Sequence, residues 1–237
     1  MRRTTHFLSG AILIVSMVAG PAVCAQFYFG ADLSYVNEME DCGVTYHDNS
    51  EAKDPYTIFW EHNCNLVRLR LWHTPSWYDN LNSGARYCDL ADAKRSIARA
   101  KEHGMAVLLD FHLSDNWADP GKQVVPAAWA PVVDDLEVLQ DSLYNYIRGT
   151  LHALDDEGLV PEMVQIGNET NRGILLSQEI NDAGWVLDWD RNSALFNTAI
   201  DAVRDFEAQA GKGFIGIVLT CQYLSGVGVL TFHIRQI

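Results

Sequence analysis

The stretch VQIGNETN, residues 164–171, places an apolar run directly before Gly167, Asn168 and the carboxylate of Glu169. Five apolar runs of this kind occur along the chain, at residues 27–34, 65–72, 105–113, 163–169 and 214–220. Segments with apolar residues at helical spacing lie between them, at residues 55–63, 89–104, 134–158 and 191–211. Strands that are almost entirely apolar and alternate with helices predict a parallel sheet covered by helices.

Polar side chains lie at or just past the C-terminal ends of four of these runs. They are Asp32 and Ser34, Arg68 and Arg70, Asp110 and His112, and Asn168 and Glu169. A doubly wound sheet and a (β/α)8 barrel both fit the alternation, but barrels draw their active-site groups from the C-terminal ends of several strands. No glycine-rich phosphate-binding motif follows any run. We therefore expect an α/β fold of the (β/α)8 TIM-barrel type, with about five βα units present.

The first 25 residues have the features of a secretory signal peptide. Arg2 and Arg3 provide the basic start, an apolar stretch follows, and small residues stand at 23–25 before a predicted cut. A lipoprotein signal would need a small residue before Cys24, where Val23 stands instead. The sequence thus predicts a signal peptide at 1–25, barrel units at 26–220 and a divergent tail at 221–237, in a protein secreted to the periplasm or the cell exterior.

Composition limits the classes of partner. Hydrophobic residues make up 48% of the chain, which permits a sizeable core, and the formal net charge is −14. Such an acidic chain is a poor match for nucleic acid or an anionic membrane and suits a neutral ligand. Beyond the predicted signal peptide, four cysteines remain: Cys42, Cys64, Cys88 and Cys221. Their spacing fits no metal motif, so we expect structural cysteines, isolated or singly paired, and no metal or cofactor.

Glu169 is the main candidate for chemistry. An acid after an apolar strand can cap a helix, form a core ion pair or catalyse a reaction. The neighbouring amide of Asn168 favours catalysis, because an amide can bind a sugar hydroxyl while the acid protonates a glycosidic oxygen.

Two further sets of residues are predicted to point to one side of their strands. Asp110 and His112 are two residues apart and share a face, either as site residues or as a buried structural pair. Arg68, Arg70 and Trp72 alternate in the same way. Buried arginines are rare without partners, so we expect carboxylates opposite these two.

Aromatic residues are frequent in the loops after these strands, where sugar rings could stack on them. They are Trp72, Trp77, Tyr78, Trp117 and Trp129. Trp117 is the preferred candidate because it lies in the polar, turn-rich segment SDNWADPGKQ. Packing over the barrel rim is the alternative for each of them.

Together these residues resemble glycoside hydrolase family 53, the arabinogalactan endo-β-1,4-galactanases. The matching blocks are FGADLSYV (29–36), NLVRLRLWHTP (65–75), LLDFHLSDNWADPGKQ (108–123) and VQIGNETN (164–171). The resemblance implies a (β/α)8 barrel and retaining endo-hydrolysis of β-1,4-galactosidic bonds in pectin galactan side chains by two glutamates. It implies that Glu169 is the acid/base and that Asn168 binds the sugar 2-hydroxyl. The predicted substrate-binding residues are Asn168, Asp110, His112, Trp117, Arg70, Asp32 and Trp72.

The sequence departs from the family pattern near its end. The family's nucleophile is a glutamate after the seventh strand, whereas residues 214–220 form only the fifth run and the last acid is Glu207. We therefore expect a truncated or frame-shifted sequence with little or no hydrolysis; a sixth strand through residues 226–234 is the alternative. Two other functions remain open: a non-catalytic galactan-binding protein, and a mannanase or cellulase, against which the 108–123 block argues.

Overall fold

A computed structural model describes residues 27–81, 84–183, 187–213 and 215–220. The predicted signal peptide (1–25), the tail (221–237) and the possible sixth strand within it lie outside the described residues, as does Cys221. In the part of the chain that is described, no helix is long and apolar enough to cross a bilayer.

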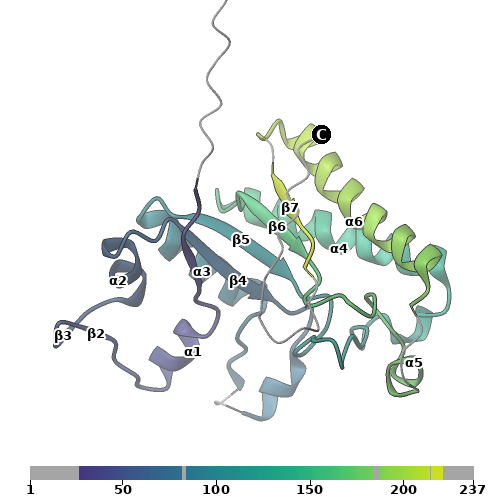
Figure 1. Cartoon of the computed structure of the whole chain (residues 1–237), viewed down its shortest axis with the longest axis horizontal. Helices are drawn as coiled ribbons and strands as arrows, with labels where there is room; N and C mark the ends of the chain where they lie inside the picture. The colour runs from purple at the N-terminus through teal and green to yellow at the C-terminus, as the bar shows by residue number, and fades with distance from the viewer. Residues whose placement is uncertain (1–26, 82–83, 184–186, 214, 221–237) are drawn as a thin grey trace, which may run out of the picture.

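Five strands form one sheet in the order β1-β4-β5-β6-β7, and every neighbouring pair is parallel (Figure 1). The strands are β1 (Gly30–Asp32), β4 (Leu66–Leu71), β5 (Ala106–Phe111), β6 (Met163–Ile166) and β7 (Gly216–Val218). Each lies within one of the five apolar runs, so the predicted strands are confirmed. Successive parallel strands joined by helices are the arrangement of a (β/α)8 barrel, of which five strands are described.

Four helices confirm the predicted helical segments. They are α2 (Pro55–Glu61), α3 (Leu90–Glu102), α4 (Leu136–Asp155) and α6 (Trp189–Ala210). An aspartate precedes each helix, and its carboxylate accepts a hydrogen bond from the backbone N–H three residues later. Glycines with positive φ end the three long helices, because a residue without a Cβ adopts this conformation at little cost: Gly104, Gly158 and Gly211.

Several short elements have no counterpart among the sequence predictions. They are α1 (Val36–Asp41), the hairpin of β2 (His47–Asp48) and β3 (Glu51–Ala52), α5 (Gln178–Asp182) and two 3₁₀ helices, η1 (Ser76–Asn80) and η3 (Ala130–Val132). Each covers less than two helical turns or only two residues of strand, too short for a periodic apolar pattern to develop.

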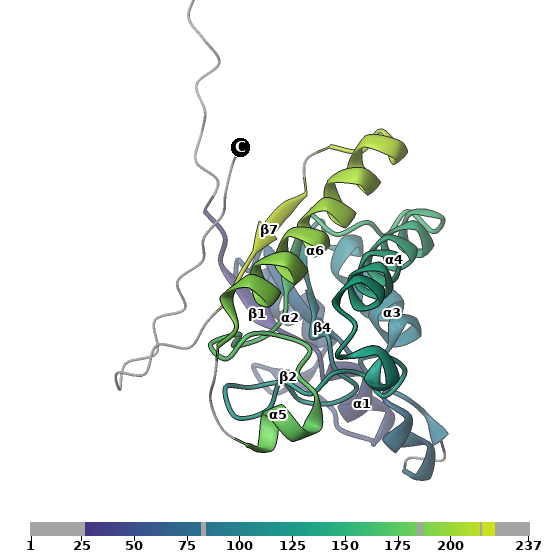
Figure 2. The ribbon, with the colours of Figure 1, turned by 90° about the vertical axis from the view of Figure 1, so that its right-hand side faces the viewer.

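The two faces of the sheet bury different kinds of side chain. Helices α3, α4 and α6 lie on one face (Figure 2), where Val67, Leu69 and Leu71 of β4 join the main core. The opposite face carries a smaller apolar cluster built on Leu108, Met163 and Val218. Since side chains alternate along a strand, Arg68 and Arg70 lie on this second face, the interior side of a barrel.

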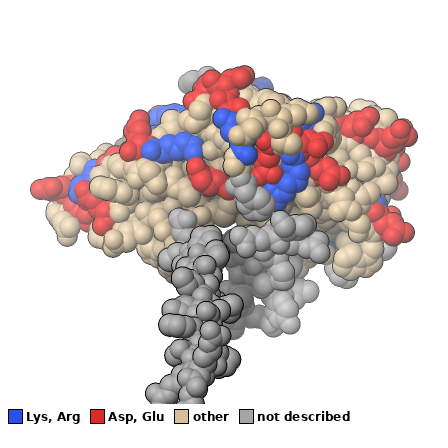
Figure 3. Space-filling view, turned by 90° about the horizontal axis from the view of Figure 1, so that it is seen from above, with Lys and Arg blue, Asp and Glu red and all other residues tan. Residues whose placement is uncertain are grey.

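The described cysteines are isolated, and the surface carries many acidic groups, as the sequence predicts. Cys42, Cys64 and Cys88 are free thiols. Acidic and basic side chains lie intermixed on the face shown in Figure 3, and red acidic groups extend to both of its ends.

Candidate functional site

Glu169 lies in a tight loop directly after β6. Gly167 has φ +73°, and Glu169 itself has φ +49°, a conformation that costs a residue with a side chain about 1–2 kcal/mol. The Gly167 N–H donates to the Phe111 carbonyl at 2.8 Å, which ties the loop to the end of β5. Glu169 is half-buried. The acid therefore stands at the C-terminal end of the sheet, as the sequence predicts.

Gly167 leaves no space for a side chain. A Cβ there would come within 2.6 Å of Thr170 Cγ2 and 3.0 Å of Ile174 Cγ2, at a φ that disfavours any other residue. We expect Gly167→Ala to lower the free energy of unfolding by at least 1–2 kcal/mol (roughly the cost of positive φ alone), measured by chemical denaturation.

Gly149 is a suitable control for this substitution. It lies inside α4, and the space that an added Cβ would occupy has no neighbouring atom within 4 Å. Gly149→Ala should therefore stabilise the protein by about 0.5–1 kcal/mol, because alanine loses less conformational freedom than glycine in a helix. Equal effects of the two substitutions would contradict the proposed crowding at Gly167.

Arg68 is the centre of the polar groups on the inner face. Its guanidinium forms ion pairs with Asp32 and with Asp110, the latter at 2.6 Å. Its Nε donates to Gln165 Oε1 at 3.0 Å, and its Nη2 donates to Asn168 Oδ1 at 3.0 Å. The predicted carboxylates opposite Arg68 are thus confirmed, and one side chain connects four of the five strand ends.

Asp110 and His112 form a fully buried pair. His112 Nδ1 lies 2.7 Å from Asp110 Oδ2, and the two residues are at most 1% exposed. Asp110 Oδ1 accepts a further hydrogen bond from Gln165 Nε2 at 3.0 Å. His112 Nε2 has no partner among the described residues. An aspartate on Nδ1 fixes the orientation of the ring and leaves Nε2 for another group.

Arg70 is surrounded by rings, so the expectation of a carboxylate opposite it is wrong for the described residues. Its guanidinium carbon lies 4.4–4.5 Å from the ring centroids of Tyr35, Trp72 and Trp117. Its Nη2 contacts Cys88 Sγ at 3.5 Å. Cation–π contacts can replace a counter-ion here because aromatic faces attract a desolvated guanidinium.

The two predicted stacking tryptophans differ in exposure. Trp72 is 2% exposed and packs against Trp77 and His112, so its ring lies beneath the surface. Trp117 is 42% exposed, and its ring centroid lies 5.5 Å from that of His112. Of the two, Trp117 alone presents an aromatic face to solvent beside the polar groups.

The pKa values of Glu169 and Asp32 are shifted in opposite directions. Burial raises the pKa of Glu169 and the negative charge of Asp119 raises it further, while His112 and Arg68 act in the other direction. Burial alone would raise the pKa of Asp32, but the charge of Arg68 and the hydrogen bonds from Ser34 outweigh it and lower the pKa. Surroundings that shift the pKa values of two carboxyl groups in opposite directions are typical of carboxyls with separate acid and anion roles.

Asp119 provides a test of this electrostatic environment. Asp119→Asn removes a negative charge that opposes ionisation of Glu169, so the pKa of Glu169 should fall in the variant. The amide oxygen can still accept the Gly121 N–H, which Asp119 Oδ1 accepts at 2.6 Å. The measurement is a carboxyl ¹³C NMR titration, with Asp156→Asn at the distant end of α4 as control. An unchanged pKa in Asp119→Asn would show that burial alone accounts for the shift.

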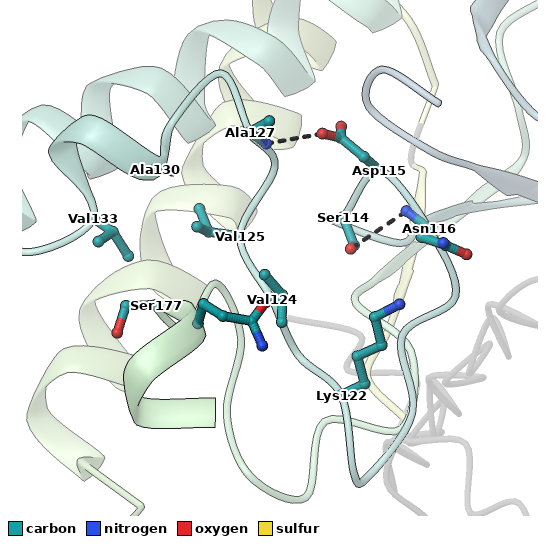
Figure 4. Close-up of a pocket in the computed structure, with 11 residues that line it drawn as sticks. Ser114, Asp115, Asn116, Lys122, Val124, Val125, Ala127, Ala130, Val133 and Ser177 are labelled. Atoms are coloured by element: carbon teal, nitrogen blue, oxygen red, sulfur yellow. Dashed lines mark hydrogen bonds between the residues drawn. The ribbon is translucent and has the colours of Figure 1, made fainter. Parts of the chain in front are cut away.

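Two of the pockets near these groups differ in their lining. One, of about 330 Å³, opens on the inner face and is lined by Asp32, Arg68 and the apolar cluster around Leu108. The other, of about 430 Å³, lies beside the loop after β5 and contains none of the predicted site residues (Figure 4). Lys122 and Val124 line this second pocket, whereas the intervening Gln123 side chain points away from it toward the Glu169 loop.

Arg68, Gln165 and Thr220 are members of the site that the predicted set does not contain. The sequence could have indicated Arg68, because it alternates with Arg70 along the strand. Gln165 is fully buried within an apolar strand and Thr220 ends the last one, and neither has a distinctive spacing. Among the described residues, no group of three or more His, Cys, Asp or Glu side chains could hold a metal ion.

The profile of Glycosyl hydrolase family 53 matches residues 28–219 of the chain. The chain belongs to this family. Family 53 relatives include an arabinogalactan endo-β-1,4-galactanase of Cellvibrio japonicus, 44% identical over 86% of this chain, and an endo-β-1,4-galactanase of Bacillus subtilis, 39% identical over 76%. This chain spans 53% of the length of the Cellvibrio japonicus protein and 40% of the length of the Bacillus subtilis protein.

Solved structures of family 53 proteins have the same arrangement of strands and helices. The catalytic domain from Ignisphaera aggregans is 33% identical with a TM-score of 0.71, covering 86% of this chain and 54% of that one. A fungal β-1,4-galactanase structure is 32% identical with a TM-score of 0.67, covering 81% of this chain and 53% of that one. The family and the barrel-type fold that the sequence predicts are thereby confirmed.

Proposed function

We propose that this chain acts on β-1,4-galactan, by endo-hydrolysis of the galactosidic bonds in pectin galactan side chains. The observation that carries the proposal is Glu169, a half-buried acid with a raised pKa, beside Asn168 and the Arg68 network. The names of the relatives, arabinogalactan endo-β-1,4-galactanase and endo-β-1,4-galactanase, support galactan as the substrate.

Glu169 would act as the acid/base of a retaining mechanism. In its protonated form it would give its proton to the glycosidic oxygen as the bond to the leaving sugar breaks, and as a carboxylate it would then deprotonate a water. Asn168 Nδ2 donates one hydrogen to the Ala118 carbonyl at 2.7 Å, which holds the amide in place. Its other hydrogen can bind the sugar 2-hydroxyl. We assign the nucleophilic carboxylate to no residue.

Galactan binding without cleavage is the second candidate function. The observation that favours it is the state of Asp32 and Asp110, whose oxygens are occupied by Arg68, Ser34, Gln165 and His112. A carboxylate held in this way is a poor nucleophile, while exposed Trp117 can still contact a sugar. The ligand is the same neutral polysaccharide in both cases, and the predicted signal peptide supports secretion of the protein.

The experiment is a comparison of polysaccharides with the purified chain from Gln26 onward. Where the chain hydrolyses a polysaccharide, reducing ends should be released from β-1,4-galactan and not from β-1,4-mannan or β-1,4-glucan. Depletion of the protein by insoluble galactan, without release, would support the binding function. Preference for mannan or glucan in either assay would contradict galactan as the ligand.

A further inference from the structure

The backbone of the Glu169 loop is held from two sides by residues of two other segments. On one side is Gln123, from the loop after β5. On the other is Thr220, directly after β7. Gln123 is 3% exposed and Thr220 is 6% exposed.

Gln123 binds the carbonyl side of the loop. Its Nε2 donates to the Asn168 carbonyl at 2.8 Å and lies 3.2 Å from the Glu169 carbonyl. The same nitrogen donates to the Asp119 carbonyl at 2.9 Å. A primary amide has two hydrogens, so three acceptors use its full donor capacity, with one hydrogen shared. Gln123 thereby fixes the backbone of Glu169 relative to that of Asp119, the residue whose charge opposes ionisation of Glu169.

Gln123 is itself held in position. Its backbone N–H donates to Asn181 Oδ1 at 3.0 Å, and its carbonyl accepts the Leu176 N–H at 2.8 Å. The segment is therefore paired along its length with the chain that follows the Glu169 loop, and the side chain has little freedom to leave the loop.

Thr220 binds the amide side of the loop. Its Oγ1 accepts the Glu169 N–H at 3.2 Å, and its carbonyl accepts both the Thr170 N–H at 2.9 Å and Thr170 Oγ1 at 2.8 Å. These bonds link the acid's loop to the next strand of the sheet. They satisfy the N–H groups of the residue at positive φ and of the residue after it.

We propose that Gln123 and Thr220 form a two-sided clamp that positions the Glu169 carboxyl, with Gln123 on the carbonyls and Thr220 on the amides of its loop. The strained φ of Glu169 needs such support, because without it the loop would relax to a commoner conformation. Relaxation would turn the carboxyl toward water. The reason for positioning the Glu169 carboxyl rests on the proposed function. The contacts of the clamp do not, and they can be tested without substrate.

The test is the pKa of Glu169, measured by carboxyl ¹³C NMR titration in four variants, with Glu169→Gln used to assign the signal. Gln123→Met keeps the side-chain length and removes the donors. Thr220→Val keeps the shape and removes the hydroxyl. In both, we expect the pKa of Glu169 to fall toward the ordinary glutamate value, because a carboxyl that gains hydration ionises more easily.

Two conservative variants are the controls. Thr220→Ser keeps the hydroxyl and should keep the wild-type pKa. Gln140→Met makes the same substitution where Gln140 Nε2 donates to Thr198 Oγ1 at 2.7 Å between α4 and α6. It should leave the pKa unchanged even where it lowers thermal stability. An unchanged pKa in both Gln123→Met and Thr220→Val would overturn the clamp.

Hydrogen exchange of the wild-type protein tests the clamp even where the variants fail to fold. The clamp requires slow hydrogen exchange at the Glu169 and Thr170 amides, comparable to the amides within β6. Exchange at the rate of an open loop would overturn the proposal. Since neither readout involves galactan, failure of the proposed hydrolysis leaves the test intact, and loss of the clamp leaves the galactan experiment intact.

Discussion

Arg68→Met is expected to lower the free energy of unfolding by about 3 kcal/mol, the lower end of the range for breaking a buried ion pair. The variant would leave Asp110, which is fully buried, without its cationic partner. It would also remove donors from Gln165 and Asn168. The lower end applies because the Asp32 side chain is 40% exposed, so water can replace part of the lost interaction. Urea denaturation at neutral pH measures the change.

Arg95→Met is the matched control for this prediction. Arg95 pairs with Asp41 at 2.7 Å, but the two side chains are 48% and 40% exposed, and such surface pairs contribute about 1 kcal/mol or less. Similar losses in the two variants would show that the Arg68 network is no more important for stability than a surface pair.

The effect of Arg68→Met should also depend on pH. Arg68 lowers the pKa of Asp32 in the folded protein, so this contribution to stability is present above the unfolded-state pKa of about 3.9. It is lost as the pH falls through the lower, folded-state value. The difference in stability between wild type and variant should therefore be largest at neutral pH and shrink in acid.

The sequence predicts the regular part of the fold well, because its signals are local. A strand such as β5 is an unbroken apolar run, and a helix such as α4 has both an aspartate cap and a terminal glycine. Short elements like α1 depend on contacts that form only after the sheet has assembled. Their residues have no period long enough to detect.

The site is harder to predict than the fold because pairing partners are far apart in the sequence. The alternation of Arg68 and Arg70 shows that both face inward, but it cannot show that one meets carboxylates and the other meets aromatic rings. Trp72 and Trp117 look equivalent as loop tryptophans, yet packing buries one and exposes the other. The contribution of Thr220 to the Glu169 loop depends on the register of β6 and β7, which no local pattern contains.

These contacts give the strand ends a division of roles. Asp32, Asp110 and Arg68 are bound to one another and form a fixed charged layer. Glu169 lies beside this layer with a raised pKa and no ion pair among the described residues. A carboxyl with a raised pKa near a fixed network of charges is suited to proton transfer, whereas the members of the network are suited to binding and orientation.

Glu169→Gln follows from this division and is expected to reduce galactan hydrolysis by about 10²–10⁴-fold, the usual contribution of a general acid/base. Glutamine has nearly the same shape but no acidic proton, so depletion by insoluble galactan should change little. Glu157→Gln, which alters a surface partner of Lys94, is the control and should keep wild-type rates of reducing-end release. Wild-type rates in Glu169→Gln would place the acid on another residue. Galactan that is bound by wild type and by Glu169→Gln but cut by neither would instead support the binding function.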